Sequence, residues 1–223
     1  MKKILKALST FIQGQKDSFK RHNAQYEAPG KFERDRDAGY LNIKNDRINW
    51  PDFLIRDLLA KHPDVKTAVD IGSGTGWVSA SLDPLVTKVI AIEPSAAAIE
   101  ISKRAYPQET YPNITWHEGF AETLLSTLTL IAPTIFVTGC VLSHLRDQEV
   151  EKICSAICVV APAGSVLAFS ECWSEETPWH QHMWHIRTKA WWEAQFPGWE
   201  LEFGGRKHEQ GNYYMGIWGV KNN

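Results

Sequence analysis

The chain has 223 residues, of which 43% are hydrophobic and 22% are charged. These proportions are typical of a globular protein and exclude a disordered, fibrous or collagen-like chain. Twenty-four Lys and Arg residues stand against 26 Asp and Glu residues, which gives a formal net charge of −2. Domains that bind nucleic acid are usually strongly basic, so this balance favours no nucleic-acid partner.

The sequence carries no recognisable signal for a membrane or for secretion. No stretch reaches the roughly 18 consecutive apolar residues that a spanning helix needs, so no transmembrane segment is expected. Met1–Leu8 begins like a signal peptide, but Lys6 interrupts its apolar run and no small-residue cleavage site follows. The four cysteines are Cys140, Cys154, Cys158 and Cys172. They form no CxxC pair and are too sparse for a disulfide scaffold, so we expect buried thiols in a cytoplasmic protein.

The chain divides into two parts. Residues 1–48 are polar and charged with little periodicity, so we expect a short N-terminal helix followed by an arm or lid. From Trp50 the pattern changes to an apolar stripe at helical spacing, and Pro51 suits the first turn of a helix that ends near Lys61. Residues 49–223 are expected to form a single domain.

Short apolar strands then alternate with helices. We expect strands at 67–71, 89–93, 114–117, 134–138 and 165–170, and helices at 95–105 and 147–160. Strands that are apolar almost throughout and separated by helices indicate a parallel sheet covered on both faces.

The last part of the chain breaks this alternation. A helix is expected over 182–196, followed by strands at 199–203 and 213–220 with only a loop between them. Two strands joined without a crossover helix pair antiparallel. The fold class is therefore α/β, a doubly wound, seven-stranded mixed sheet with an antiparallel last pair of strands.

The most informative segment is the glycine-rich turn Gly72-Ser73-Gly74-Thr75-Gly76, directly after the strand that contains Asp70. Glycines between a strand and a helix let a ligand approach the backbone closely and meet free amide groups. Glu93 ends the second strand, where a carboxylate can accept hydrogen bonds from both hydroxyls of a ribose. Glycines in this position, followed by an acid at the end of the next strand, predict a nucleoside-binding site.

The spacing of the glycines separates two kinds of nucleoside site. Dinucleotide sites carry G-x-G-x-x-G, whereas this sequence has the tighter G-x-G-x-G, preceded by an acid two residues before the first glycine. This motif resembles the S-adenosylmethionine-binding motif of class I methyltransferases, and the resemblance covers about residues 50–220. It implies the Rossmann-like methyltransferase fold, S-adenosyl-L-methionine as cofactor and methyl transfer as the activity. A dehydrogenase and a tight turn without a ligand are the alternatives.

The resemblance also implies roles for individual residues. Asp70 and the glycines would hold the methionine part of the cofactor, and Glu93 its ribose. Phe120 stands where the family often has an Asp that contacts the adenine, so stacking and backbone amides would hold the adenine, with Glu122 as a polar contact. The expected cofactor-binding residues are Asp70, Gly72, Ser73, Gly74, Gly76, Glu93, Pro94, Phe120, Ala121, Glu122 and Thr138.

Three residues are candidates for catalysis. His144 follows the fourth strand, in the loop that lies near the transferable methyl group in the family, and a neutral imidazole accepts a proton near neutral pH. The alternative is that His144 caps the helix beginning near Asp147. Glu171, at the end of the fifth strand, is the next candidate, with orienting the histidine or binding an acceptor hydroxyl as its other roles. His185 is the third, because it would lie on the helix over the pocket.

Absent motifs narrow the acceptor. The fourth strand is followed neither by (Asp/Asn/Ser)-Pro-Pro-(Tyr/Phe), typical of amino methyltransferases acting on nucleobases, nor by the Pro-Cys of covalent cytosine chemistry. We therefore expect O-methylation of a small-molecule or glycan hydroxyl. Methylation of an amine or of an RNA or protein group is the first alternative. A cofactor-binding module without catalysis is the second. The oligomeric state stays open.

The segment 171–199 contains six of the ten tryptophans. Its tryptophans suit stacking on sugar rings and Arg187 suits pairing with a carboxylate or phosphate, but core packing is an equal alternative. His182 and His185 are three residues apart, as metal ligands on one helix face would be. No acid or thiol completes that set, so no metal is expected.

Overall fold

The computed structural model describes residues 50–176, 178–181, 184–204 and 214–222. The expected N-terminal arm or lid, residues 1–48, lies outside the described residues, so the division into arm and domain stays a prediction. None of the helices in the described ranges is both long and apolar enough to cross a membrane.

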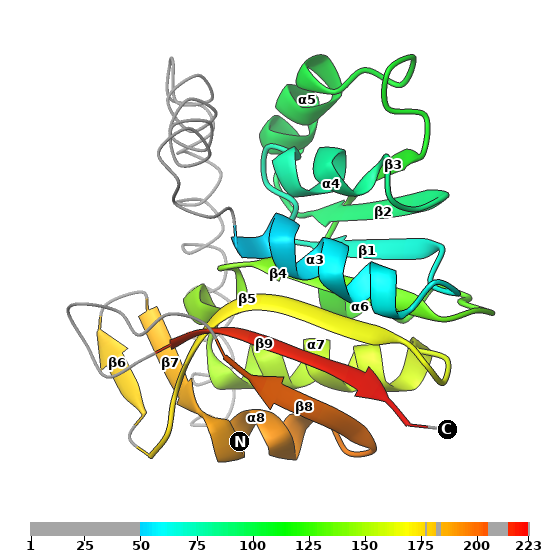
Figure 1. The fold of residues 1–223 in the computed structure, drawn as a ribbon. Helices are drawn as coiled ribbons and strands as arrows, with labels where there is room; N and C mark the ends of the chain where they lie inside the picture. Colours follow the sequence, from blue (N-terminus) through cyan, green and yellow to red (C-terminus); the bar gives the residue numbers. More distant parts are fainter. Residues whose placement is uncertain (1–49, 177, 182–183, 205–213, 223) are drawn as a thin grey trace.

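A mixed sheet of nine strands forms the centre of the described chain (Figure 1). Its parallel strands lie in the order β3 (Ile114–Glu118), β2 (Lys88–Glu93), β1 (Thr67–Ile71), β4 (Thr134–Gly139) and β5 (Val166–Ser174). β9 (Tyr214–Lys221) pairs antiparallel with β5, and β8 (Trp199–Phe203) pairs antiparallel with β9. The expected mixed sheet with an antiparallel last pair is confirmed.

Helices cover both faces of this sheet. On one face lie α3 (Trp50–Lys61) and α4 (Trp77–Leu82), and α5 (Ala96–Ala105) packs against β2 and β3. On the other face lie α6 (Ala121–Leu125), α7 (Asp147–Val160) and α8 (Lys189–Gln195). The helix expected at 147–160 has the predicted bounds, and the helix expected at 95–105 begins one residue later.

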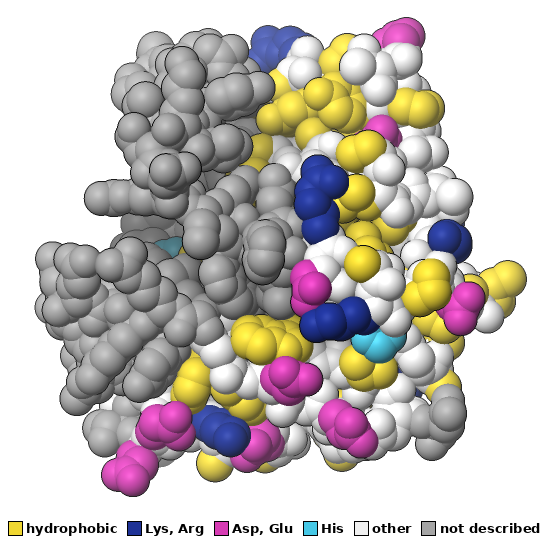
Figure 2. All heavy atoms as spheres, in the orientation of Figure 1, with side chains coloured by type: hydrophobic (Ala, Val, Ile, Leu, Met, Phe, Trp, Pro, Cys, Tyr) yellow, Lys and Arg dark blue, Asp and Glu magenta, His cyan; other side chains and the backbone are white. Residues whose placement is uncertain are grey.

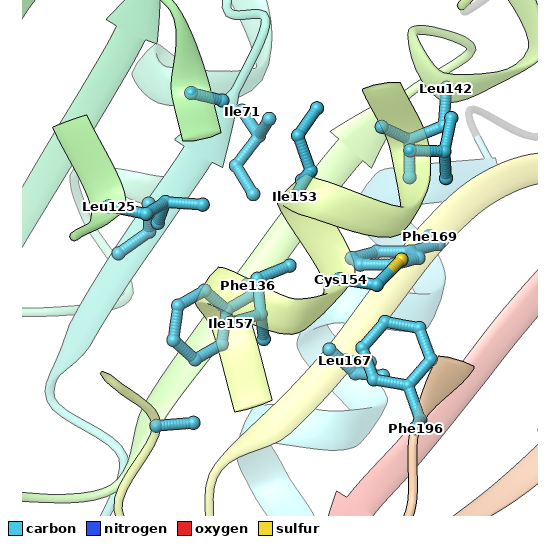
Figure 3. Packing of buried hydrophobic residues seen from close by; sticks show 14 of the residues in the cluster. Ile71, Leu125, Phe136, Leu142, Ile153, Cys154, Ile157, Leu167, Phe169 and Phe196 are labelled. Carbon is cyan, nitrogen blue, oxygen red and sulfur yellow. The ribbon is translucent and has the colours of Figure 1, made fainter. Parts of the chain in front are cut away.

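Successive strand residues point to opposite faces, so the sheet has two hydrophobic cores. Toward α7, the strands bury Ile71, Phe136, Leu167 and Phe169 against Ile153 and Ile157 (Figure 3). Toward α3 and α4, they bury Ala68, Val137 and Ala168 against Leu58 and Leu82. Burial on both faces explains why these strands read as nearly continuous apolar runs in the sequence.

The helix predicted over 182–196 was wrong in its first half. The described chain there forms the antiparallel hairpin β6 (Trp179–Gln181) and β7 (Trp184–Thr188), and the helix α8 begins only at Lys189. Thr188 marks the boundary because its hydroxyl accepts a hydrogen bond from the Trp191 amide (3.1 Å), as an N-cap does. Aromatic and β-branched residues before that cap favour a strand. The hairpin accounts for nine strands instead of the expected seven.

β7 lies beside the last residues of β5, beyond the end of β4. Trp173 of β5 pairs with Tyr214 of β9 on one edge and in parallel with Arg187 of β7 on the other. The hairpin is therefore placed at the edge where the parallel strands end, as Figure 1 shows. This edge also carries the glycine-rich turn.

We predict that the packing of α7 on the sheet is a major source of stability. The Ile157 side chain is fully buried, whereas Val159, on the same helix, is 80% exposed. Ile157→Ala should lower the free energy of unfolding by about 2–5 kcal/mol, because it leaves a cavity in the core. Val159→Ala should change it by less than about 0.5 kcal/mol. Urea unfolding of both variants measures the difference, and equal effects would contradict the described packing.

Candidate functional site

The glycine-rich turn joins the carboxyl end of β1 to α4 with three residues of left-handed backbone. The φ angles of Gly72, Gly74 and Gly76 are 70°, 54° and 88°. A Cβ atom at Gly72 would lie 2.6 Å from Val141 Cγ2, and one at Gly76 would lie 2.5 Å from Trp116 Cη2. Backbone conformation and lack of space therefore both require glycine, and the turn presents main chain at this edge of the sheet.

A buried carboxylate ties this turn to the neighbouring strand. Glu93, 1% exposed at the end of β2, accepts hydrogen bonds from the Gly74 amide through Oε2 (3.0 Å) and from the Ser95 amide through Oε1 (2.9 Å). The Gly72 and Ser73 amides both donate to the Ile92 carbonyl (2.8 and 3.0 Å). A carboxylate can accept several hydrogen bonds, and ribose hydroxyls are suitable donors.

Asp70 is a second buried acid at this edge. Its Oδ2 accepts a hydrogen bond from the Ser79 hydroxyl of α4 (2.5 Å). Burial, together with the nearby charge of Glu93 and against a lowering by the Ser79 hydrogen bond, raises the pKa of Asp70 to about 7. A cation bound beside Asp70 would favour its ionised form.

Two buried hydroxyls at this edge have no hydrogen-bond partner among the described residues. They are Ser73 Oγ in the turn and Thr138 Oγ1 in β4. β1 and β4 pair Ile71 with Thr138, so both hydroxyls lie where these strands end. Because buried polar groups in proteins are normally paired, two unpaired hydroxyls beside a glycine-rich turn indicate a polar ligand. These residues fit the polar methionine part of S-adenosylmethionine.

The residues expected at the adenine follow β3. The Gly119 amide donates to the Glu93 carbonyl (3.1 Å), which holds the start of α6 beside the end of β2 and the half-buried Pro94. Phe120, the N-cap of α6, is 52% exposed, and Ala121 and Glu122 form the first turn of the helix. An exposed aromatic ring at this position suits stacking on a base.

The loop after β4 contacts the glycine-rich turn. It contains the short 3₁₀ helix η1 (Leu142–His144), and the Val141 side chain just before it packs against Gly72. His144 is exposed at the end of η1. The N-cap of α7 is Arg146, whose amide donates to Glu149 Oε2 (2.9 Å). The alternative that His144 caps this helix is therefore wrong.

Glu171 holds that loop from inside the sheet. It is buried in β5, and its carboxylate accepts hydrogen bonds from the amides of Val141 (2.8 Å), Leu142 (3.0 Å) and Ser143 (2.9 Å) and from the Ser143 hydroxyl (2.8 Å). Four donors from one short segment saturate most of the accepting capacity of a carboxylate. Of the roles predicted for Glu171, this geometry favours orienting the segment that carries His144.

Arg187 lies inside the protein, so core packing is the correct one of its two alternatives. Its guanidinium donates to the Leu142 carbonyl (2.9 Å), the Leu145 carbonyl (2.6 Å) and Asp147 Oδ1 (2.9 Å). Burial lowers the pKa of Arg187, while Asp147 raises it in part. No pattern in the sequence distinguished this buried arginine from one that faces a pocket.

The remaining catalytic candidate, His185, lies on β7 rather than on the predicted helix. It is half-buried and pairs with His180 across the β6–β7 hairpin. The tryptophans of this segment also serve the core: Trp173, Trp192 and Trp199 are buried. For these three, core packing is the correct alternative, and the structure gives them no face for a sugar.

The cysteines offer no reactive thiolate, and the described residues offer no metal site. The four cysteines are free thiols. Burial, with the nearby Glu171 and Cys172, raises the pKa of Cys140 to about 12, which disfavours the thiolate that a nucleophile requires. Within the described ranges, no three His, Cys, Asp or Glu side chains are grouped as metal ligands. His182, half of the predicted pair, lies outside them.

Comparison with known proteins assigns the family. Residues 68–164 match a family described as a methyltransferase domain, a segment that contains the glycine-rich turn, Glu93 and the loop after β4. Residues 68–164 therefore form a methyltransferase domain, and this match together with the fold supports the predicted class I S-adenosylmethionine-dependent methyltransferase, with S-adenosylmethionine as cofactor. No curated protein sequence matches the chain.

Solved structures of methyltransferases share the fold over most of the chain. A magnesium protoporphyrin IX methyltransferase from Synechocystis PCC 6803, solved with bound SAM, has a TM-score of 0.65 at 17% identity and covers 92% of this chain and 97% of its own. An amino pentose methyltransferase from Micromonospora echinaspora has a TM-score of 0.61 at 15% identity, covering 82% and 96%. A TehB-like SAM-dependent methyltransferase from Corynebacterium glutamicum has 0.58 at 18%, covering 87% and 100%. Identities this low establish the fold alone.

We predict that Glu93 is needed for cofactor binding. Glu93→Ala removes the acceptor that fixes Gly74 and that we assign to the ribose, and one hydrogen bond to a charged group is worth about 1.5–3 kcal/mol. Calorimetry should show at least roughly tenfold weaker binding of S-adenosylhomocysteine. Glu118→Ala is the matched control, because this exposed acid pairs with Glu93 in the sheet register. Equal affinity in wild type and Glu93→Ala would overturn the ribose assignment.

We also predict that Asp70 lowers the stability of the protein without cofactor above neutral pH. Its pKa of about 7 in the folded chain exceeds the pKa of about 3.9 in an unfolded chain. The folded state therefore binds more protons between these values, and stability contributed by Asp70 falls as pH rises through that range.

Asp70→Asn cannot ionise and keeps a similar size. Its melting temperature should exceed that of the wild type at pH 8, by an equivalent of at most about 4 kcal/mol, and the difference should shrink toward pH 5. Calorimetric melting at both pH values measures this, and a difference that grows toward low pH would contradict the assignment. The same variant should bind S-adenosylhomocysteine more weakly than wild type.

Proposed function

We propose that this methyltransferase methylates a hydroxyl oxygen of a small molecule or sugar, with His144 as the general base. The observation that carries the proposal is the position of His144. It is exposed at the end of a loop whose Val141 packs on Gly72 of the glycine-rich turn. An imidazole beside the cofactor site is the group expected where an acceptor hydroxyl must lose a proton.

In this proposal the turn and its neighbours hold the cofactor. S-adenosylmethionine supplies a methyl group on a positively charged sulfur. Asp70, Ser73 and Thr138 lie with the glycine amides on the side assigned to the methionine part, and Glu93 accepts from the ribose. Phe120, Ala121 and Glu122 enclose the adenine, with Pro94 between the ribose and adenine sides. A buried acid beside the turn suits a cationic ligand, because the positive charge lowers the cost of ionising Asp70.

The protein assists the transfer mainly by position. The acceptor oxygen forms a bond to the methyl carbon as the bond from that carbon to sulfur breaks, and the proton of the hydroxyl passes to the His144 imidazole. Holding the reacting atoms in line lowers the activation free energy by several kcal/mol, because the reactants no longer have to find this geometry by diffusion. The neutral imidazole contributes through proton transfer, typically about 10²–10⁴-fold in rate.

The nature of the acceptor is supported by the surface and by the comparisons. On the face shown in Figure 2, Lys and Arg side chains of the described residues are interspersed with Asp and Glu and form no single basic patch. That pattern suits a small acceptor better than a nucleic acid. The amino pentose methyltransferase among the structural neighbours shows that this fold accommodates a sugar methyltransferase.

We predict that His144→Ala lowers kcat by about 10²–10⁴-fold while S-adenosylhomocysteine binds with unchanged affinity. The measurement is release of S-adenosylhomocysteine with hydroxyl-bearing small molecules and glycosides, beside amines, RNA and protein as competing acceptor classes. His117→Ala is the control, because His117 is an exposed histidine on β3. Full turnover in His144→Ala would exclude His144 as the base, and no turnover with any acceptor would favour a cofactor-binding module.

A further inference from the structure

Two buried residues of opposite charge hold the loop that carries His144. Glu171 accepts hydrogen bonds from its amides at Val141, Leu142 and Ser143. Arg187 donates to its carbonyls at Leu142 (2.9 Å) and Leu145 (2.6 Å). The loop thus donates hydrogen bonds from its amides to a buried carboxylate and accepts hydrogen bonds at its carbonyls from a buried guanidinium.

This arrangement supplies hydrogen-bond partners to the ends of a short 3₁₀ helix. The first amides and the last carbonyls of any helix lack partners within the helix, and the amide end carries partial positive charge while the carbonyl end carries partial negative charge. Glu171 accepts from the first amides of η1, and Arg187 donates to the carbonyl of its C-cap Leu145, so an anion lies at the first end and a cation at the second. η1 has only three residues, so its shape depends on such outside partners.

Each member of the pair is itself fixed. Glu171 lies within β5, and its Oε2 also accepts from the Ser143 hydroxyl (2.8 Å). The Arg187 guanidinium is held by Asp147 Oδ1 (2.9 Å) and lies over the Trp191 ring, 4.9 Å from its centroid. β5 and β7 pair in parallel at Trp173 and Arg187, so Glu171 and Arg187 lie on neighbouring strands of the sheet.

Burying two charges is expensive, and apolar residues of similar size would often give equal or greater stability. Stability alone therefore does not require these two charges. We propose that Glu171 and Arg187 are positioning residues that fix His144 relative to the acceptor hydroxyl, an inference that rests on the proposed role of His144 as base. The hairpin β6–β7 is then the element that brings the cationic half of the pair to the site.

A double-mutant cycle tests this inference. Arg187→Lys keeps a positive charge but loses the planar fork that reaches two carbonyls and Asp147 together. We expect kcat to fall by about 10²-fold, as for a misplaced reacting group, with S-adenosylhomocysteine affinity unchanged. In a His144→Ala background the same substitution should lower kcat by less than about threefold, because the group that Arg187 positions is gone.

The outcomes distinguish the positioning role of Glu171 and Arg187 from the role of His144 as the base. Suppose that His144→Ala lowers kcat and that Arg187→Lys lowers kcat by the same factor in both backgrounds. The positioning role is then overturned and the base assignment stands. The same conclusion follows if Arg187→Lys does not lower kcat at all. If His144→Ala leaves kcat unchanged, both are overturned. Lys189→Gln, at a neighbouring half-buried cation that pairs with Glu193, is the control for charge removal near this site.

A second variant serves if Arg187→Lys does not fold. Ser143→Ala keeps both buried charges and removes the hydroxyl, which donates to Glu171 Oε2 (2.8 Å) and accepts from the Cys172 amide (3.3 Å). It should lower kcat by roughly threefold to tenfold and speed amide hydrogen exchange at Val141, Leu142 and Ser143, with exchange in β1 unchanged. Unchanged kcat and unchanged exchange at these amides would overturn the positioning role, whatever the behaviour of the arginine variant.

Discussion

Hydrogen bonds that backbone amides donate to buried carboxylates hold together the edge of the sheet on which the site is built. Where parallel strands end, the chain must turn sharply and leaves amides without partners. Glu93 takes up the amides of Gly74 and Ser95, and Glu171 takes up three amides of the loop after β4. Both acids are buried, so their hydrogen bonds are protected from competition by water.

These two carboxylates hold the glycine-rich turn and the loop after β4 beside each other. The glycine-rich turn held by Glu93 and the loop held by Glu171 meet where Val141 packs on Gly72. A side chain larger than hydrogen at position 72 would push the loop, and with it His144, away from the turn. Glycine at this position is thus required by the contact between the two halves as well as by its backbone conformation.

The site also contains several features that lower the stability of the folded protein. Asp70 is buried with a pKa raised to about 7, two hydroxyls are buried without partners in the described chain, and Cys140 adopts a φ of 59°. Each feature is unfavourable in isolation, and all lie at the carboxyl ends of β1 and β4. Such a concentration is typical of a site prepared for a ligand that supplies the missing interactions.

Much of the fold could be predicted because strands buried on both faces of a sheet appear in the sequence as short, continuous apolar runs. The strands through β5, the helix at 147–160 and the antiparallel last pair follow from apolar runs and their separation. The glycine-rich turn and Glu93 could be found from spacing, since close approach of a ligand restricts which residues fit.

The remainder depends on contacts that leave no local pattern. Tryptophans at helical spacing predicted one helix over 182–196, whereas the N-cap Thr188 divides the segment into β7 and α8. The partners of Glu171 and Arg187 lie about 30 to 45 residues away along the chain. A sequence shows such residues as ordinary charges, and only the packing of β7 beside β5 shows that they hold one loop from its two ends.

Transfer of a methyl group from S-adenosylmethionine to an oxygen at this edge of the sheet can be tested directly. S-adenosylmethionine labelled with carbon-13 in the methyl group is incubated with a mixture of hydroxyl-bearing small molecules, glycosides, amines and RNA. Carbon-13 NMR and mass spectrometry of the products then locate the label. We predict that the label appears on an oxygen of a small molecule or sugar and that S-adenosylhomocysteine forms in equal amount. Label on nitrogen, on RNA or on protein would contradict the proposed function.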